Sequence, residues 1–351
     1  MKEIHEMYMQ RCLELARLGA GLVSPNPMVG AVIVCQGKII GEGWHQQYGM
    51  PHAEVNAIQQ VLEPALLIES DLYVNLEPCA HTGKTLPCAD LILKHKIKRV
   101  IIGMSDPNPL VAGKGIALLK DAGIEVITDI LNQECLEFNR RFVKQMLHQR
   151  PYIILKWAQT QNGYLAPLAN KMSAIQFEEE RHITGFMVQR LVHKWRTQED
   201  AIMVATNTVV TDNPALDARA WKGRAPKRIV LDRTLRLDLN LKVFKGPQET
   251  FIVNGIKDEI QGNLTYVKVD FMGNWIDEIF KRLLSFNIQS IVVEGGSVWL
   301  HTLLEQKYWD EAIVFYSPKH ISEGVPAPAI GGKLVQQFEL DNMQASQYLN
   351  V

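Results

Sequence analysis

Short apolar runs that predict buried strands alternate with helical patterns along the whole chain, and this alternation constrains the fold more than any other feature. Strands separated by helices are typical of α/β domains. The pattern ends with a helix expected over residues 132–148 and begins again with an apolar strand over residues 152–157. A chain of 351 residues is also long for one domain. We therefore predict two α/β domains, which span residues 1–148 and 151–351.

The charge balance and the cysteines restrict the class of protein. Lys and Arg number 37 against 38 Asp and Glu, so the chain lacks the strong positive charge of proteins that coat nucleic acid. The five cysteines are few and far apart, which argues against a disulfide framework and favours a reducing cytoplasm. No signal peptide is evident, and no apolar run reaches the roughly 18 residues of a membrane span. We expect a cytoplasmic protein with a small-molecule substrate, no nucleic-acid partner and no membrane partner.

The pattern with the most specific chemistry is His52-Ala53-Glu54, followed later by Cys79 and Cys88. One imidazole and two thiolates can hold a tetrahedral zinc whose fourth position is open for water, and zinc lowers the pKa of that water to about 7. Glu54 lies two residues past the histidine, where it could move protons without binding the metal. We expect each of the three ligands at the start of a helix that follows a strand. This arrangement is that of the zinc-dependent nucleobase deaminases.

Two other interpretations of these residues stay open. A closed structural zinc would need a fourth protein ligand, for which His81 is the candidate, although His81 could instead contact substrate. A nucleic-acid deaminase would need a basic groove with aromatic side chains on which bases stack.

The spacing of the two cysteines differs from the Cys-x-x-Cys of cytidine deaminases, because an eight-residue loop separates them. That loop contains Gly83 and Lys84, residue types that cradle a phosphate or a sugar.

Several segments of the first domain carry a family resemblance. They are Pro25-Asn26-Pro27-Met28-Val29-Gly30, Leu76-Glu77-Pro78-Cys79, Thr85-Leu86-Pro87-Cys88, Asp106-Pro107-Asn108-Pro109 and Gly113-Lys114-Gly115. These segments resemble the bifunctional riboflavin biosynthesis proteins, and the long loop between the cysteines is specific to that family among deaminases. The resemblance covers nearly all of the first domain.

The resemblance implies a cytidine-deaminase-like α/β/α fold for the first domain. It also implies zinc-dependent deamination of 2,5-diamino-6-(5-phosphoribosylamino)pyrimidin-4-one. The zinc ligands would be His52, Cys79 and Cys88, and the proton shuttle would be Glu54. Asn26 would hydrogen-bond the substrate ring, and Lys84 would pair with the substrate phosphate. From the residues alone, Asn26 could also be a turn former between two prolines.

Three segments of the second domain resemble the reductase half of the same family. They are Lys156 to Gly163, Ile202 to Leu216, and Glu294-Gly295-Gly296. Two glycines between a strand and a helix N-terminus let backbone amides approach a phosphate closely. The resemblance implies a dihydrofolate-reductase-like α/β domain that reduces the ribosyl group to ribityl with NADPH. The NADPH site would contain Gln159, Thr208, Asp212, Gly296, Ser297 and Val298, and the substrate site Arg196, Leu216, Arg219 and Glu294.

Departures from the family pattern leave a second hypothesis open, a deaminase whose C-terminal domain is degraded or repurposed. Asn162 stands where the family usually has aspartate, and Ala205 where it has glycine. His182 replaces a common tryptophan, and Glu180 lies where a small hydroxyl residue usually contacts substrate. A third, non-enzymatic hypothesis makes the zinc structural and the protein a binding module. The resemblance also implies a homo-oligomer, either a dimer or a tetramer.

Overall fold

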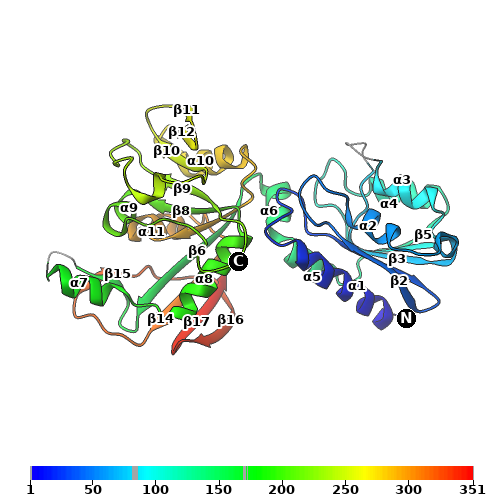
Figure 1. Ribbon diagram of the computed structural model, residues 1–351, viewed down its shortest axis with the longest axis horizontal. Coiled ribbons are helices and arrows are strands. Elements are labelled where there is room, and N and C mark those ends of the chain that lie inside the picture. The colour runs from blue at the N-terminus through cyan, green and yellow to red at the C-terminus, as the bar shows by residue number, and fades with distance from the viewer. Residues whose placement is uncertain (1, 81–85, 169–170, 172, 351) are drawn as a thin grey trace. The chain divides into compact units, whose positions relative to one another are not determined.

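The computed structural model describes residues 2–80, 86–168, 171 and 173–350, and the chain divides into two compact units, Met1–Gln149 and Arg150–Val351 (Figure 1). Each unit combines helices with a sheet that contains parallel strands, which confirms the predicted α/β class. Among the described residues, no helix has the length and apolar character needed to cross a membrane.

The first unit is built on a five-stranded sheet in the order β2-β1-β3-β4-β5. β1 (Gly30–Cys35) pairs antiparallel with β2 (Lys38–Trp44) and with β3 (Asp71–Leu76). β3, β4 (Arg99–Met104) and β5 (Glu125–Ile127) run parallel. The helices are α1 (Lys2–Ala16), α2 (Ala53–Gln59), α3 (Cys88–Lys94), α4 (Lys114–Asp121), α5 (Asn132–Phe138) and α6 (Arg140–His148).

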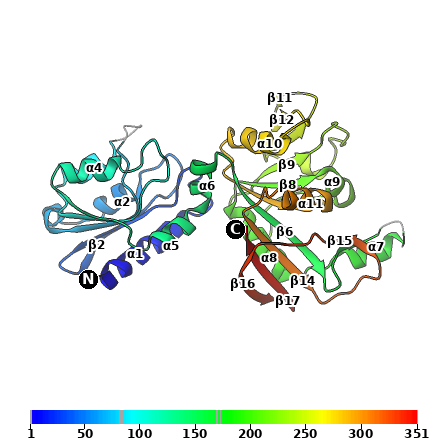
Figure 2. The same cartoon turned by 180° about the vertical axis from the view of Figure 1, so that it is seen from behind.

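Helices cover both faces of this sheet, because successive strand residues point to opposite sides. Ala31 and Ile33 of β1 pack with apolar residues of α2, α3 and α4. Val32 and Val34 of the same strand pack with residues of α1, α5 and α6. The unit is therefore an α/β/α sandwich, whose helical layers are visible from both sides (Figures 1 and 2).

The expected single helix over residues 132–148 is wrong, because the chain divides at Asn139 into α5 and α6. The buried Asn139 side chain holds the backbone of Met28. Its Oδ1 accepts a hydrogen bond from the Met28 amide at 2.9 Å, and its Nδ2 donates to the Met28 carbonyl at 3.0 Å. The helix is interrupted at Asn139, where the side chain makes this long-range contact.

The expectation that Cys79 lies at the start of a helix is also wrong, since residues 77–80 are irregular. The buried carboxylate of Glu77 accepts hydrogen bonds from the backbone amides of Asp106 and Gly115, which lie beyond the next strand. The Glu77 side chain thus ties the segment to a distant loop instead of starting a helix. Cys79 consequently lies on a loop, whereas Cys88 is the first residue of α3.

The second unit contains a ten-stranded sheet in the order β11-β12-β10-β9-β8-β13-β6-β14-β17-β16 and a two-stranded sheet of β15 and β7. The strands are β6 (Tyr152–Thr160), β7 (Tyr164–Pro167), β8 (Ala201–Ala205), β9 (Lys227–Leu231), β10 (Thr250–Asn254), β11 (Glu259–Gln261), β12 (Leu264–Lys268), β13 (Ser290–Glu294), β14 (Glu311–Ser317), β15 (Gly324–Pro326), β16 (Lys333–Leu340) and β17 (Met343–Leu349). The helices are α7 (Ala174–Arg181), α8 (Phe186–Gln198), α9 (Thr206–Asp212), α10 (Trp275–Leu284) and α11 (Ser297–Glu305).

The strands from β12 to β14 in this order are parallel, whereas β11, β17 and β16 form antiparallel edges. The chain passes from β6 to β8 and later returns through β13, which lies between them. In open parallel sheets, ligands bind at the carboxyl ends of strands where the winding direction reverses. The topology thus indicates a candidate ligand site at the carboxyl ends of β6, β8 and β13.

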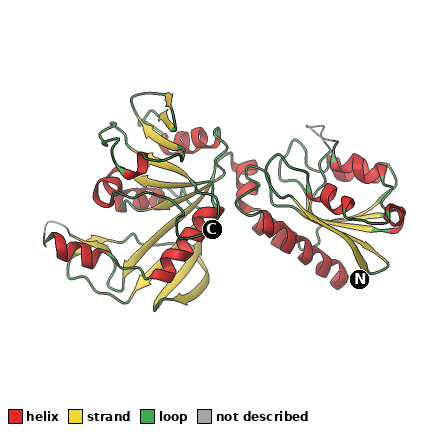
Figure 3. Ribbon diagram, in the orientation of Figure 1, coloured by secondary structure: helices red, strands yellow, loops and turns green. Residues whose placement is uncertain are grey.

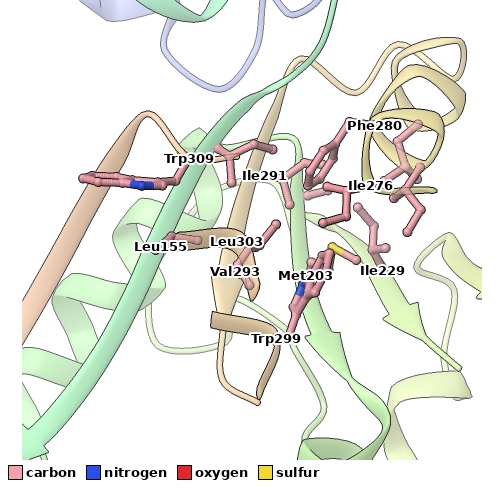
Figure 4. Packing of buried hydrophobic residues seen from close by; sticks show 14 of the residues in the cluster. Leu155, Met203, Ile229, Ile276, Phe280, Ile291, Val293, Trp299, Leu303 and Trp309 are labelled. Atoms are coloured by element: carbon pink, nitrogen blue, oxygen red, sulfur yellow. The ribbon is translucent and has the colours of Figure 1, made fainter. Parts of the chain in front are cut away.

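A large apolar core holds one face of this sheet against α10 and α11 (Figure 4). Leu155, Met203 and Val293 point from three neighbouring strands toward Phe280 of α10 and Leu303 of α11. A separate apolar cluster on the other face includes two buried residues of α8. Helices therefore flank this sheet too (Figure 3), and the buried layers fix the strand ends relative to one another.

Candidate functional site

Close packing of α2 against the hairpin of β1 and β2 positions His52 and Glu54. A Cβ added to Gly43 of β2 would lie 2.4 Å from the backbone nitrogen of Ala57, so only glycine permits this approach. His52 is the N-cap of α2, and Glu54 lies in its first turn. Glu54 is only 3% exposed, and its burial raises the pKa of the carboxyl group. A carboxyl pKa closer to neutrality suits a group that both takes and gives a proton.

The three expected metal ligands lie together. His52 Nδ1 is 3.3 Å from Cys88 Sγ and 3.7 Å from Cys79 Sγ, and the three ligand atoms lie within 4.8 Å of one another. Typical zinc–sulfur and zinc–nitrogen bond lengths in a tetrahedron place such atoms about 3.5–3.8 Å apart, so the donor set fits zinc. Within the described residues, no fourth side chain joins this metal-ligand group.

Two hydrogen bonds donated by backbone amides hold the two cysteines close together. The amide of Cys88 donates to Cys79 Sγ at 3.4 Å, and the amide of Ala89 donates to the Cys79 carbonyl at 3.1 Å. The hydrogen bond from the Cys88 thiol lowers the pKa of Cys79 to about 4, against the opposing effect of burial. A lowered thiol pKa favours the thiolate, which is the form that binds zinc. Lys84 and His81 lie outside the described residues.

A cavity of about 490 Å³ opens onto the ligand group. It is lined by Asn26, Pro27, Val29, His45, His52, Glu54, Leu76, Glu77, Cys79, Asp106, Asn108, Leu110, Val111, Phe142 and Met146. All of these residues belong to the first unit, and the lining mixes polar and apolar side chains. Such a cavity suits a small ring with polar substituents.

Asn26 lies in the wall of this cavity and also forms a turn, so both interpretations of it fit the structure. Its amide nitrogen donates a hydrogen bond to the Val23 carbonyl at 2.9 Å, and its Nδ2 lies 3.1 Å from His45 Nε2. His45 Nδ1 lies 3.1 Å from the Pro51 carbonyl, which requires a proton on Nδ1. His45 Nε2 then accepts from Asn26 and fixes the orientation of its amide. The sequence reasoning missed His45, whose only signal was a buried histidine after a strand.

In the second unit, an ion cluster lies where the carboxyl end of β13 pairs with the middle of β6. Arg196 forms two hydrogen bonds with the Glu294 carboxylate, at 3.0 and 2.8 Å, and Lys156 Nζ lies 3.9 Å from the same carboxylate. Burial alone would raise the pKa of Glu294, but these two cations lower it to about 2. Burial lowers the pKa of Lys156. No local sequence pattern links Lys156 to Glu294, so their proximity could not be predicted from the sequence.

The glycine pair after β13 approaches the start of α9 closely. Gly295 and Gly296 have φ of 94° and 82°, which side chains other than glycine rarely adopt. A Cβ on Gly295 would lie 3.3 Å from the Thr208 side chain, and one on Gly296 would lie 3.1 Å from Ala205 Cβ. Thr208, Gly296 and the first turn of α11 therefore meet. Ser297 Oγ donates to the Pro326 carbonyl at 3.2 Å, and Val298 is 77% exposed.

The other expected residues of this unit have different surroundings. Arg219 is exposed and pairs with Asp217 at 2.6 Å, and the Asp217 carbonyl accepts a hydrogen bond from Arg196 at 2.9 Å. Leu216 is buried, with a φ of 50°. Gln159 accepts from Trp157 Nε1 at 2.8 Å, on the strand that also carries Lys156. Asp212 ends α9 and forms an ion pair with Arg181 at 3.4 Å.

The residues that depart from the family pattern do not disrupt the fold of this unit. Asn162 accepts a hydrogen bond from Thr160 Oγ1 at 2.9 Å and donates to the Ile321 carbonyl at 2.7 Å, so it holds the turn after β6. Glu180 and His182 are exposed, at the end of α7 and directly after it.

Comparisons with known proteins agree with both halves of this description. The family model for the "RibD C-terminal domain" matches residues 151–350, and that for the "Cytidine and deoxycytidylate deaminase zinc-binding region" matches residues 2–104. The riboflavin biosynthesis protein RibD of Aquifex aeolicus is 37% identical over 342 residues, which is 96% of this chain and 93% of that protein. The Escherichia coli protein of the same name is 35% identical over 90% of this chain and 88% of its own length.

Solved structures extend the similarity to the whole chain. A diaminohydroxyphosphoribosylaminopyrimidine deaminase/5-amino-6-(5-phosphoribosylamino)uracil reductase from Thermotoga maritima matches with a TM-score of 0.89 and 32% identity. The match covers 100% of this chain and 99% of that one. RibD of Acinetobacter baumannii matches with a TM-score of 0.88 and 30% identity, over 99% of each chain.

Proposed function

The chain belongs to the family of bifunctional riboflavin biosynthesis proteins, and from this premise we propose its substrates and the residues that act on them. It is an enzyme with a zinc-dependent deaminase domain and an NADPH-dependent reductase domain. The proposed domain limits are residues 1–148 and 151–351. The proposed substrate is 2,5-diamino-6-(5-phosphoribosylamino)pyrimidin-4-one, whose ribosyl group is reduced to ribityl after deamination. The alternative of a deaminase with a degraded second domain is not favoured, because the reductase family model matches nearly all of that domain.

The deaminase proposal depends on one observation, the grouping of His52, Cys79 and Cys88 beside the buried Glu54. Zinc held by these three side chains would supply a Lewis acid that makes water a nucleophile near neutral pH. With zinc bound, Glu54 would carry protons from the water to the ring nitrogen and to the amino group, while the water oxygen bonds to the ring carbon and ammonia leaves. Asn26, held by His45, accepts a hydrogen bond from the ring. Lys84 is proposed to pair with the substrate phosphate.

X-ray absorption at the zinc edge of the full-length protein tests this proposal. We expect one nitrogen, two sulfurs and one exchangeable oxygen, because the ligand group described above has three members. Four protein ligands with no exchangeable oxygen would instead indicate a closed structural zinc. That result would support the non-enzymatic hypothesis and contradict the role given to Glu54.

For reduction, we assign NADPH to the edge where β8 and β13 end, with Thr208 and the Gly296–Val298 turn against its phosphates and Gln159 and Asp212 nearby. The positive φ values of Gly295 and Gly296 support this assignment, since such a turn lets amides approach an anion. The ribosyl phosphate is assigned to the side that carries Arg196, Leu216, Arg219 and Glu294. NADPH bound at this edge would supply the hydride that reduces the opened sugar carbon, with a proton from solvent or a side chain completing the reduction.

The variant Gly296→Ala tests the cofactor assignment. Its Cβ would crowd Ala205 at 3.1 Å and strain a φ of 82°, so we expect the dissociation constant of NADPH to rise by roughly tenfold or more. Gly246→Ala is the matched control, because Gly246 has a φ of 85° with nothing within 4 Å of the added Cβ. Equal NADPH affinity in both variants would place the cofactor elsewhere.

We also propose a cytoplasmic homo-oligomer that acts on a free phosphorylated pyrimidine and not on nucleic acid. The five cysteines form no disulfide, which supports a reducing compartment. Light scattering on the purified chain tests the oligomeric state, and a monomer at micromolar concentration would contradict it.

A further inference from the structure

Glu77, two residues before Cys79, holds a cluster of backbone amides with a buried carboxylate. Its side chain is 5% exposed. Oε2 accepts from the amides of Asp106 and Gly113, both at 3.0 Å, and Oε1 accepts from Gly115 at 2.9 Å and Ile116 at 3.2 Å. None of the deamination steps proposed above involves Glu77.

The amides that Glu77 binds belong to one segment, residues 106–116, which comprises most of the loop after β4 and the first residues of α4. Much of this segment forms a wall of the deaminase cavity, through Asp106, Asn108, Leu110 and Val111. The segment keeps its own shape, because the Asp106 carboxylate accepts from the Asn108 amide at 2.8 Å and Asn108 Oδ1 accepts from the Leu110 amide at 3.1 Å. Glu77 then fixes this preformed wall to the strand end that leads to Cys79.

Close packing between Gly115 and Pro78 also attaches the 106–116 segment to the residues before Cys79. A Cβ on Gly115 would lie 2.1 Å from the Pro78 carbonyl oxygen and 3.2 Å from Glu77 Oε1. The segment therefore packs directly on the peptide that precedes the ligand Cys79. The hydrogen bonds of Glu77 and this close packing together fix the position of the 106–116 segment relative to Cys79.

We propose that Glu77 is a positioning residue for deamination, whose carboxylate holds the 106–116 wall at the distance from the metal ligands that the substrate ring and its substituents require. This inference depends on the proposed deaminase function. Glu77 touches neither the ligand atoms nor Glu54 through any hydrogen bond described above, so its loss changes where substrate is held and not how protons move. The Michaelis constant is then the sensitive quantity, and kcat is not.

The experiment compares Glu77→Gln with wild type in the zinc-loaded, full-length enzyme, by ultraviolet deamination assays. Gln keeps the size of the side chain but points an NH2 group at backbone amides, which leaves buried donors unsatisfied. We expect KM to rise by roughly 5- to 100-fold, kcat to stay within about 3-fold, and zinc content to remain unchanged. Amide exchange should accelerate at Gly113, Gly115 and Ile116.

Two further variants complete the test. Gly115→Ala leaves Glu77 intact but pushes the segment away from Pro78, so it should give the same selective rise in KM, and it decides the question if Glu77→Gln does not fold. Asp71→Asn removes a carboxylate at the opposite end of the same strand, where it pairs with Arg99, and should leave KM unchanged. The reductase activity of each variant serves as an internal control.

Each possible result is decisive. An unchanged KM in both Glu77→Gln and Gly115→Ala overturns the inference, as does a loss of zinc or a loss confined to kcat. A wild type that does not deaminate the substrate at all contradicts the proposed function instead. In that case accelerated exchange at the three amides would still show that Glu77 holds the segment, but not that it positions a substrate.

Discussion

Removal of the charge on Glu294 is expected to destabilise the second unit strongly. Glu294 and Arg196 are only 12% and 14% exposed, and Lys156 shares the same carboxylate. A pKa of about 2 instead of the ordinary 4.5 corresponds to roughly 3 kcal/mol of stabilisation at neutral pH, since each pH unit is about 1.4 kcal/mol. This agrees with the roughly 3–5 kcal/mol lost when one partner of a buried ion pair is removed. Glu294→Gln should therefore lower the unfolding midpoint by about 6–12 °C.

Tryptophan fluorescence of the full-length chain can follow this unfolding, because six of the seven tryptophans lie in the second unit. The matched control is Asp258→Asn, which breaks an exposed ion pair with Arg282 and should change stability by less than about 1 kcal/mol. In wild type, the depressed pKa means that this stabilisation is present above about pH 4.5 and is lost as the pH falls toward 2. Equal midpoints for Glu294→Gln and Asp258→Asn would refute the reasoning.

Other predictions concern the first unit. Glu54→Gln should lower kcat for deamination by roughly 10²- to 10⁴-fold with zinc content unchanged, as metal analysis and ultraviolet assays can show. Cys88→Ser should lose zinc and deamination, yet still oxidise NADPH when supplied with deaminated substrate; loss of both activities would argue against separate sites. Gly43→Val should displace α2, because even a Cβ would lie 2.4 Å from the Ala57 nitrogen. Destabilisation of roughly 1–3 kcal/mol is expected in chemical denaturation, and an unchanged midpoint would contradict the close packing.

Local patterns predicted the buried strands and the ligand group, because both depend on residues close in sequence or on a fixed order of motifs. β1 is a continuous apolar run, β3 and β4 are mostly apolar, and His52, Cys79 and Cys88 follow one another in a recognisable order. The irregular path at Cys79 could not be predicted in this way. It depends on Glu77, whose hydrogen-bond partners begin 29 residues later.

The same limit applies to the second unit. β13 lies between β6 and β8, so Lys156 and Glu294, far apart in sequence, become register partners on neighbouring strands. β16 carries mostly exposed residues and lacks the apolar alternation that would have identified it. Sequence periodicity therefore reports which side of an element is buried, and it does not report which elements become neighbours.

One assay tests the central claim of two linked activities most directly. The proposed diaminopyrimidinone substrate is given to zinc-loaded enzyme, and its ultraviolet spectrum is followed first without and then with NADPH. The account predicts a change in the ring spectrum before NADPH is added, and oxidation of NADPH only afterwards. Deamination without any oxidation of NADPH would contradict the reductase assignment, and no spectral change at all would contradict the proposed function as a whole.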